Sequence, residues 1–322
     1  MYQEVRMKKK IFLLFIVPAI VIASVFSGCG QKENQVSGVK IVSTIFPQYD
    51  FARAITGDKG SLKMLIPPGG EAHTYEPTPQ DIISIQEADV FLYIGGESDA
   101  WVDNILDSVN TSKTKVVRLI DYVDTLQEET VEGMQEEKHS DEAGDEPETD
   151  EHIWTSPKNA VKMVNAISDA ICRADSQNDK YYKENTKDYV SELEELDKSF
   201  SEIVKNGKRN EIIFGDRFPL IYFTKEYGLK YYAAFPGCAS ETEPSASTIA
   251  FLTDKVKEDK IPVVFKIELS SSAVADTIAG ETGAEVLTFY SCHNLSKEQF
   301  NNGETYLSMM TDNLTALKTA LN

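Results

Sequence analysis

Apolar and polar positions follow two different periods along most of this chain. Residues 90–94 are apolar throughout, which is expected of a strand buried on both faces of a sheet, and residues 39–43 also have the length of a strand. The segments at 46–58 and 78–89 place apolar residues every three or four positions, which is typical of amphipathic helices. Strands that alternate with helices at this spacing predict parallel βαβ units.

The alternation starts again in the second half of the chain. Strands are predicted at residues 39–43, 62–66, 90–94, 115–121, 210–216, 230–235, 262–268 and 284–290. Between the two sets, residues 179–207 predict one long helix, with a single apolar stripe over about seven turns. The predicted fold class is therefore α/β: two parallel-sheet lobes, at 38–156 and 207–322, joined through a helical region at 157–206.

The first 28 residues have the layout of a secretory leader. Basic residues at positions 6 and 8–10 precede an uncharged, mostly apolar run at 11–26, and Ser27-Gly28-Cys29 follows. This layout resembles a bacterial lipoprotein signal, which predicts that Cys29 becomes a lipidated N-terminus and that residues 29–37 form a tether. An ordinary signal peptide or a membrane helix is the alternative, but the apolar run is short for a bilayer span.

The net charge of the chain restricts the kinds of molecule that it is expected to bind. The formal net charge is −20, and removing the leader, with its one acid and four bases, takes it to −23. Such a surface disfavours nucleic acid and anionic lipid and favours cations, so the lipid anchor is the only predicted membrane contact. Twelve acids lie in residues 128–151 with a single base, Lys138, so a mobile acidic loop is predicted there.

Imidazoles are the clearest sign of chemistry, because the chain has only four histidines. His73 and His293 each follow a predicted strand, and His152 lies between the acidic segment and a helix start. Ligand groups in open α/β sheets gather beyond the carboxyl ends of strands, so two facing lobes would bring these histidines to one cleft. Neutral imidazole is a common zinc ligand, and a fourth ligand would complete a tetrahedral site. His139, in the acidic segment, is at most an auxiliary capture site.

Three segments resemble the zinc/manganese ABC-transporter substrate-binding lipoproteins, the ZnuA/TroA-like family. They are LIPPGGEAHTYEPTPQDIISIQEADVFLYIG, DEHIWTSPKNA and EYGLKYYAAFPGCASETEPSASTIAFL, and the resemblance extends over nearly all of the chain after the leader. It implies two α/β lobes joined by one long rigid helix, a metal site in the cleft between them, and an ABC-transporter permease as partner. It also implies that His73 and His152 are metal ligands.

The second lobe departs from the family pattern, which indicates a variant subgroup. Where the family has a His or Glu ligand, this chain has Arg217, which stays protonated and cannot bind a metal. Its neighbour Asp216 is the predicted replacement, or else it pairs with Arg217 or caps the next helix. Where the family has a final Asp ligand, this chain has Tyr290, and His293 is the predicted replacement.

The cysteines and a few flanking residues have predicted supporting roles. Apart from Cys29, the chain has Cys172, Cys238 and Cys292, so at most one disulfide forms within it. A Cys238–Cys292 disulfide is predicted to hold the loop of His293, with Cys172 free and buried; Cys292 as a thiolate ligand is the alternative. Glu243, Tyr75 and Glu76 are predicted to support the ligands rather than to bind the metal.

Together these features predict an exported, monomeric zinc-binding protein held by its lipid at the outer face of the bacterial cytoplasmic membrane. It would capture Zn²⁺ and deliver it to an ABC importer, with no catalytic step. Mn²⁺ is the less favoured ion, because the ligand set has few carboxylates. Two alternatives stay open. One is a zinc-dependent hydrolase with an open coordination position, and the other is a manganese-binding protein or adhesin of the same fold.

Overall fold

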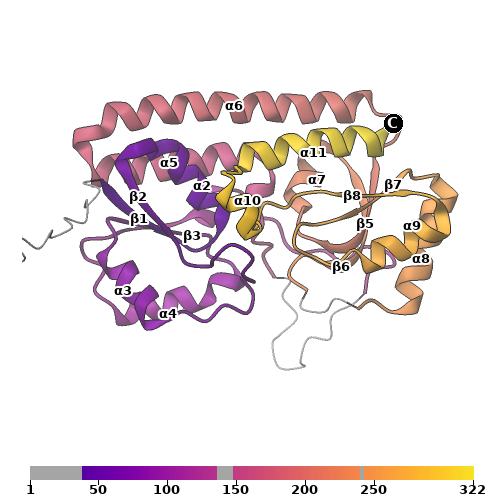
Figure 1. Cartoon of the computed structure of the whole chain (residues 1–322), viewed down its shortest axis with the longest axis horizontal. Helices are drawn as coiled ribbons and strands as arrows, with labels where there is room; N and C mark the ends of the chain where they lie inside the picture. The colour runs from indigo at the N-terminus through magenta and orange to yellow at the C-terminus, as the bar shows by residue number, and fades with distance from the viewer. Residues whose placement is uncertain (1–37, 136–147, 240–242) are drawn as a thin grey trace, which may run out of the picture. The chain divides into compact units, whose positions relative to one another are not determined.

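The first lobe is a parallel sheet with helices on both faces (Figure 1). The computed structural model describes residues 38–135, 148–239 and 243–322. The strands β1 (Val39–Ser43), β2 (Gly60–Met64), β3 (Val90–Tyr93) and β4 (Lys115–Arg118) run in the order β2-β1-β3-β4. Helices α2 (Phe46–Thr56) and α5 (Pro157–Ala174) cover one face, and α3 (Pro79–Glu87) and α4 (Ala100–Ser108) cover the other.

The central strand β3 shows why apolar and polar residues do not alternate along it. Val90 and Leu92 are in the core on the side of α2 and α5, whereas Phe91 and Tyr93 are in the core on the side of α3 and α4. All four side chains are buried. A strand covered on both faces must be apolar at every position, so the run at 90–94 is explained.

Two predicted helix starts are confirmed by their capping contacts. The Thr78 hydroxyl accepts the backbone N–H of Asp81, and the Asp81 carboxylate accepts the backbone N–H of Thr78, which forms a capping box at α3. At α5, the Ser156 hydroxyl accepts the backbone N–H of Asn159. The second cap matters for the site, because it fixes the chain four residues after His152.

The second lobe repeats the plan of the first. Its strands β5 (Glu211–Phe218), β6 (Lys230–Pro236), β7 (Val263–Lys266) and β8 (Glu285–Thr288) are parallel, in the order β6-β5-β7-β8. Helices α7 (Ile221–Tyr227) and α11 (Tyr306–Leu321) pack on one face, and α8 (Ala246–Asp259) and α9 (Ala273–Thr282) on the other. The short α10 (Lys297–Asn301) was not predicted, because five residues are too few to show a helical period.

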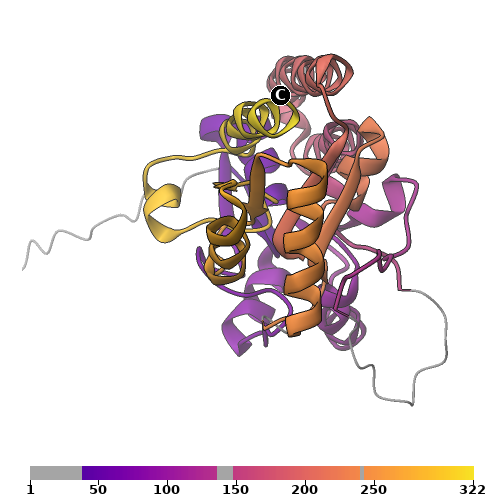
Figure 2. The same cartoon turned by 90° about the vertical axis from the view of Figure 1, so that its right-hand side faces the viewer.

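The long helix α6 (Asp179–Asn206) joins the lobes and runs along both (Figure 1). Its 28 residues correspond to about 42 Å of helix. Its buried residues follow the predicted stripe: Tyr182, Thr186, Tyr189, Leu193, Leu196 and Phe200. Helix α11 lies beside α6 in both views (Figures 1 and 2), and one hydrophobic core with residues from both lobes lies beneath them. A hinge motion would have to disturb this shared core.

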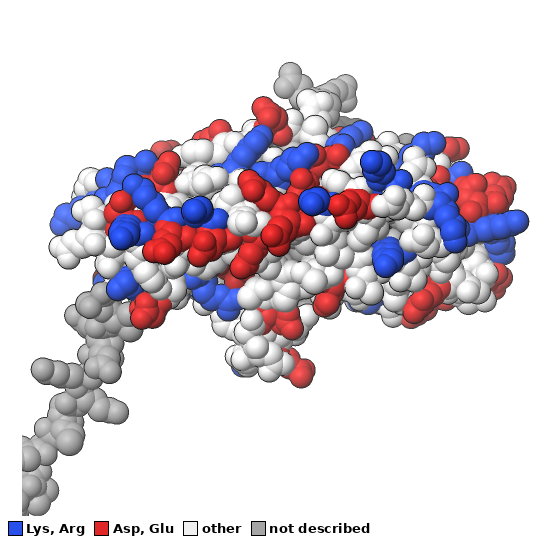
Figure 3. All heavy atoms as spheres, turned by 90° about the horizontal axis from the view of Figure 1, so that it is seen from above, with Lys and Arg blue, Asp and Glu red and all other residues white. Residues whose placement is uncertain are grey.

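The surface along α6 carries charges of both signs. Figure 3, seen from above, shows Lys and Arg interspersed with Asp and Glu. The pair Asp179–Lys183, at 2.9 Å, is one example on α6 itself. Exposed pairs of this kind contribute little to stability, so the buried stripe is what holds the helix in place.

The two described ends of the acidic segment, which was predicted to be a mobile loop over residues 128–151, make backbone hydrogen bonds to one another and to the second lobe. The backbone N–H of Glu128 donates to the carbonyl of Glu148, which pairs the two ends. Farther along, the backbone N–H of Gln135 donates to the carbonyl of Ala234 in β6. Backbone hydrogen bonds to another element supply the ordering that the polar composition does not reveal.

Several predictions lie outside the described residues. These are the leader at 1–28, the tether at 29–37 with Cys29, and the part of the acidic segment at 136–147, which contains His139. Within the described ranges, no helix is both long and apolar enough to cross a bilayer.

Candidate metal site

Three histidines from three separate loops meet between the lobes. His73 lies between β2 and α3, His152 just before α5, and His293 after β8. Their ring centroids are 5.6 Å (His152–His293), 5.7 Å (His73–His293) and 6.3 Å (His73–His152) apart. Imidazoles that share one zinc ion have centroids roughly 5 Å apart, because each Zn–N bond is about 2.0–2.1 Å long. The structure thus brings the three predicted ligands together at nearly the spacing that one ion requires.

Contacts on several sides fix the ring of His152, which is fully buried. The Asp150 Oδ1 accepts the backbone N–H of His152 at 2.8 Å and lies 3.3 Å from the ring Nδ1. The ring of Trp154 packs against it with a centroid distance of 5.4 Å. Gly237 approaches so closely that a Cβ at this position would lie 3.2 Å from Cε1 of His152. With Nδ1 beside Asp150, Nε2 is the nitrogen left for a ligand.

The loop of His293 is held by a buried carboxylate, Glu268, that the sequence analysis missed. Its oxygens accept the backbone N–H and the hydroxyl of Ser291, both at 2.7 Å, and the backbone N–H of His293 at 3.0 Å. Trp154 packs on the His293 ring at 5.2 Å and donates its indole N–H to the Ser291 carbonyl at 2.8 Å. Glu268 is the last residue of the predicted strand at 262–268. Because site residues gather at the carboxyl ends of parallel strands, this position could have identified it.

The ring of His73 is oriented by Ser98 and Glu151. The Ser98 Oγ lies 2.9 Å from Nδ1 of His73, and the Glu151 Oε1 lies 4.0 Å from the same nitrogen. Ser98 also donates its backbone N–H to Glu151 Oε2 at 2.9 Å and its hydroxyl to Oε1. Glu151 is only 3% exposed. It was predicted as the last acid of a mobile loop, although its place next to His152 was a signal for a site residue.

The three imidazoles differ in their affinity for protons. Burial lowers the pKa of His73 and lowers that of His293 well below its usual value, so both rings are neutral at pH 7. Burial also opposes a charge on His152, but the nearby carboxylates, Asp150 above all and then Glu151 and Glu128, together outweigh it and raise the pKa. In the described part of the chain, Nε2 of His152 and Nε2 of His293 are buried without a hydrogen-bond partner. A bound cation would satisfy both lone pairs.

A small cavity lies among the rings, with a volume of about 50 Å³. It has room for an ion or a few water molecules, whereas pockets for organic ligands typically have about 300 Å³ or more. Both lobes line it: Gly70, Glu71, Ala72, His73, His152, Arg217, Pro219, Gly237, Ile267, Glu268, Leu269, Ser291, His293 and Asn294. The Arg217 Nη2 lies 3.7 Å from the Glu71 Oε2, so a weak ion pair connects the lobes beside the cavity.

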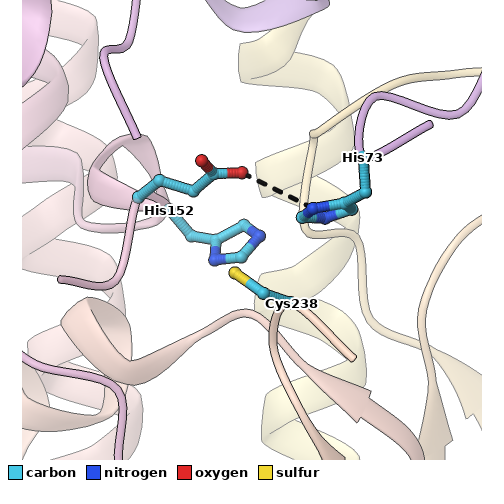
Figure 4. A group of neighbouring side chains, drawn as sticks. His73, His152 and Cys238 are labelled. Atoms are coloured by element: carbon cyan, nitrogen blue, oxygen red, sulfur yellow. Dashed lines mark ion pairs between the residues drawn. The ribbon is translucent and has the colours of Figure 1, made fainter. Parts of the chain in front are cut away.

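Cys238 lies among the ligand groups, which the sequence analysis did not foresee. One ligand atom from each of four residues, His73, Glu151, His152 and Cys238, lies within 4.8 Å of all the others (Figure 4). Burial, together with the nearby acids, raises the pKa of the Cys238 thiol, so it is protonated when no cation is bound. The position of Cys238 directly after a strand could have identified it as a possible site residue. The sequence analysis used that position to predict a disulfide.

The predicted Cys238–Cys292 disulfide is wrong, because both residues are free cysteines. Cys292 is fully buried in the main hydrophobic core, whereas Cys238 is partly exposed and faces His152 (Figure 4). The two thiols therefore lie in different environments. The loop of His293 is held instead by Glu268 and by the core packing of Cys292.

Asp216 is not among the groups around the cavity, contrary to its prediction as a ligand. Its Oδ2 accepts the backbone N–H of Ile267 at 3.0 Å and the hydroxyl of Ser270, and its Oδ1 accepts the backbone N–H of Arg217 at 2.8 Å. Asp216 thus holds the turn after β7. The sequence could not show this, because the turn lies about fifty residues farther along the chain.

The other predicted supporting residues lie away from the cavity. Glu243 and Glu76 are exposed and do not line it. Tyr75 donates its hydroxyl to the Asp81 carboxylate at 2.8 Å, so it supports the start of α3. Cys172 is free and buried, as predicted.

A cluster of ligand groups buried between two α/β lobes that share a long helix defines a substrate-binding protein for a metal ion. Comparison with known proteins gives the particular family. Residues 41–320 match the family model ZnuA, described as the zinc-uptake complex component A, periplasmic. The chain therefore belongs to the ZnuA family. Members of this family are binding proteins and not enzymes, so the hydrolase alternative is rejected.

Individual relatives agree with this assignment. The chain is 34% identical over 329 residues to the high-affinity zinc uptake system protein ZnuA of Bacillus subtilis, which covers 98% of this chain and 99% of that protein. It is 32% identical over 313 residues to the zinc-binding lipoprotein AdcA of Streptococcus pneumoniae. That match covers 96% of this chain but 60% of AdcA, so this chain spans less than two thirds of AdcA.

Solved structures show the same fold. The metal-dependent lipoprotein YcdH of Bacillus subtilis superposes with a TM-score of 0.75 at 34% identity, over 88% of this chain and 100% of that one. The Zn(II)-bound ZnuA-like domain of Streptococcus pneumoniae AdcA superposes with a TM-score of 0.72 at 30% identity, over 88% of this chain and 99% of that one. The prediction of two parallel-sheet lobes joined by a long helix is confirmed.

Proposed function

We propose that this protein captures Zn²⁺ outside the cytoplasm and delivers it to the permease of an ABC importer. The observation that carries the proposal is the pair of buried Nε2 atoms of His152 and His293, which have no hydrogen-bond partner among the described residues, beside His73 and an ion-sized cavity. Imidazole nitrogen suits Zn²⁺, whereas Mn²⁺ prefers sites richer in oxygen. The names of the relatives, a zinc uptake protein and a zinc-binding lipoprotein, support the same ion.

In this proposal the three imidazoles bind the ion and the surrounding carboxylates hold the imidazoles. Asp150 lies behind His152, and Glu268 anchors the loop of His293. Carboxylates behind ligating imidazoles fix the orientation of the ring and raise its basicity. The ion undergoes no reaction, so it leaves as it arrived.

Release of the ion to a permease would require the loops on both sides of the cavity to move together. The Asn294 amide donates to the carbonyls of Pro67 and Gly70 at 3.0 and 2.8 Å, and the backbone N–H of Gly69 donates to the carbonyl of Leu295 at 2.9 Å. These contacts tie the loop that leads to His73 to the loop that follows His293. The shared core under α6 restrains the lobes themselves, so we assign release to these loops.

The proposal places the protein at the outer face of the cytoplasmic membrane, as a monomer attached through lipid on Cys29. The layout of residues 1–29 supports the lipid, and one relative is described as a lipoprotein. The net charge of −20 suits capture of a cation and disfavours nucleic acid as a partner.

Metal titration of the purified protein tests the binding step. We expect tight, one-to-one binding of Zn²⁺, weaker binding of Mn²⁺, and loss of at least about tenfold in Zn²⁺ affinity in His73→Ala and in His152→Ala. Unchanged affinity in both variants would overturn the proposal. Delivery is tested in a bacterium that lacks its own zinc-binding transport component. Growth at low zinc should be restored by the intact chain but not by His152→Ala.

A further inference from the structure

The feature that goes beyond this function is the free thiol of Cys238. It follows β6 in a turn that begins at Pro236 and passes through Gly237. Its backbone N–H donates to the Glu128 Oε1 at 3.1 Å, so a residue of the acidic segment, which extends from the first lobe, holds the turn from outside. The thiol is therefore carried on a backbone that contacts both lobes.

The sulfur lies among groups that bind metals. Its Sγ and one ligand atom from each of His73, His152 and Glu151 all lie within 4.8 Å of one another, and Figure 4 shows the sulfur beside the ring of His152. Zinc–sulfur bonds are about 2.3 Å and zinc–nitrogen bonds about 2.0–2.1 Å, so ligand atoms around one ion are normally about 3.3–4 Å apart. The sulfur therefore lies within reach of an ion held by His73 and His152.

A second, independent observation also indicates a ligand at this position. The buried Nε2 of His152 has no hydrogen-bond partner in the described part of the chain. The neighbour of Cys238, Gly237, lies so close to this ring that a Cβ would be 3.2 Å from Cε1. The Gly237 backbone thus packs against this ring, and the thiol of the next residue lies in the same cluster as the imidazole.

The neighbouring carboxylates are already engaged. Both oxygens of Glu151 accept hydrogen bonds from Ser98, and Glu268 holds the backbone of the His293 loop. Asp216 is used in the turn after β7. Among the described residues of the second lobe, His293 and Cys238 are the groups beside the imidazoles that remain for the ion.

We propose that Cys238 is a ligand of the bound ion and that the site is tetrahedral, with two ligands from each lobe. The ligands would be His73 and His152 from the first lobe and His293 and Cys238 from the second. This inference rests on the proposed function. A thiolate favours thiophilic cations, so Cys238 gives the site its preference for Zn²⁺ and Cd²⁺ over Mn²⁺. On binding, the S–H proton is released to solvent and the sulfur lone pair forms the metal bond.

Cobalt substitution tests the metal–sulfur bond directly. Co²⁺ bound by a thiolate has a strong sulfur-to-metal charge-transfer band in the near ultraviolet, which nitrogen and oxygen ligands do not produce. We expect this band in the Co²⁺-loaded protein, and we expect it to be lost in Cys238→Ser. Cys172→Ser is the matched control that should keep it, because Cys172 packs in the main hydrophobic core and is not among the clustered ligand groups. Thermal melting of each variant checks that it is folded.

The outcomes separate this inference from the proposed function. One-to-one binding of Co²⁺ or Zn²⁺ without a thiolate band would overturn the role of Cys238 and leave the proposed function intact. A band that persists in Cys238→Ser would also overturn it. Absence of any tight metal binding would overturn the proposed function itself.

Metal preference gives a second test. In Cys238→Ser we expect Zn²⁺ and Cd²⁺ affinity to fall by at least about tenfold, with a much smaller change for Mn²⁺. An equal loss for all three ions would show that Cys238 supports the site without selecting the ion.

Discussion

The carboxylate of Asp150 lies 3.3 Å from Nδ1 of His152 and accepts the backbone N–H of the same residue at 2.8 Å. One acid therefore fixes both the ring and the chain of a central ligand. It also raises the pKa of His152 above the usual value of 6.5, against the effect of burial. Because a metal binds only the neutral ring, protons compete with Zn²⁺ at His152 before they do at His73 or His293.

Zn²⁺ affinity should therefore depend on pH through His152. The contribution of the imidazoles is complete above the pKa of His152 and is lost as the pH drops through it, whereas His73 and His293, with lowered pKa values, stay neutral. Release of the proton of the proposed ligand Cys238 adds a rise in affinity with pH over the whole range. In Asp150→Asn we expect about tenfold weaker binding at pH 7.5, from loss of ring orientation. We also expect the fall in affinity to begin at lower pH, because the ring loses its negative neighbour. Chelator competition between about pH 5.5 and 8 measures both.

A surface variant provides the control for this pH experiment. Asp121 is 59% exposed and pairs only with Arg118 among the described contacts, so Asp121→Asn should leave the profile unchanged. A pH profile that stays the same in Asp150→Asn would mean that Asp150 has only a structural role.

Substitutions of His293 and Asp216 should have different effects, one on Zn²⁺ affinity and the other on the stability of the fold. We expect His293→Ala to weaken Zn²⁺ binding by more than about tenfold, because it removes one of three imidazoles. We expect Asp216→Ala to keep the affinity within about threefold and to lower the free energy of unfolding by about 2 kcal/mol, because it removes hydrogen bonds to a buried carboxylate. Calorimetric titration and chemical denaturation measure the two effects. Tight Zn²⁺ binding by His293→Ala would exclude this residue as a ligand.

Glu268→Gln should affect both binding and stability. The substitution replaces an acceptor oxygen by an N–H₂ group that faces backbone N–H groups of Ser291 or His293. We expect the free energy of unfolding of the metal-free protein to fall by about 2 kcal/mol and Zn²⁺ affinity to fall with it. Saturating Zn²⁺ should recover part of the melting temperature. A variant as stable as the wild type would show that Glu268 does not hold this loop.

Residues 136–147 of the acidic segment should contribute to the rate of capture and not to the equilibrium affinity. We expect deletion of residues 136–147 to leave Zn²⁺ affinity within about threefold and to slow association at low salt, since negative charge steers cations. Deletion of all of residues 128–151 should instead abolish tight binding, because it removes Asp150 and Glu151 beside the imidazoles. Stopped-flow mixing at about 0.01 M and 0.15 M ionic strength measures the rates. A large loss of affinity in the shorter deletion would indicate a ligand within it.

The sequence alone determined those features that arise from local patterns. The period of the apolar residues predicted the strands of both sheets and the helix that joins them, because a buried strand and an amphipathic helix each require a distinct spacing. The positions of His73, His152 and His293 at strand ends and helix starts predicted that they would meet, because parallel strands all end at the same edge of a sheet.

The tertiary structure decided which neighbouring groups share the site with those histidines. Glu151 directly precedes the proposed ligand His152, and Asp216 directly precedes Arg217, which lines the cavity. Yet Glu151 lies beside His73, whereas Asp216 holds a turn after β7. Cys238, expected in a disulfide, lies instead beside His152. These outcomes depend on contacts between residues that are distant along the chain. Such contacts follow from how the two lobes pack around one core, and no local period in the sequence encodes that packing.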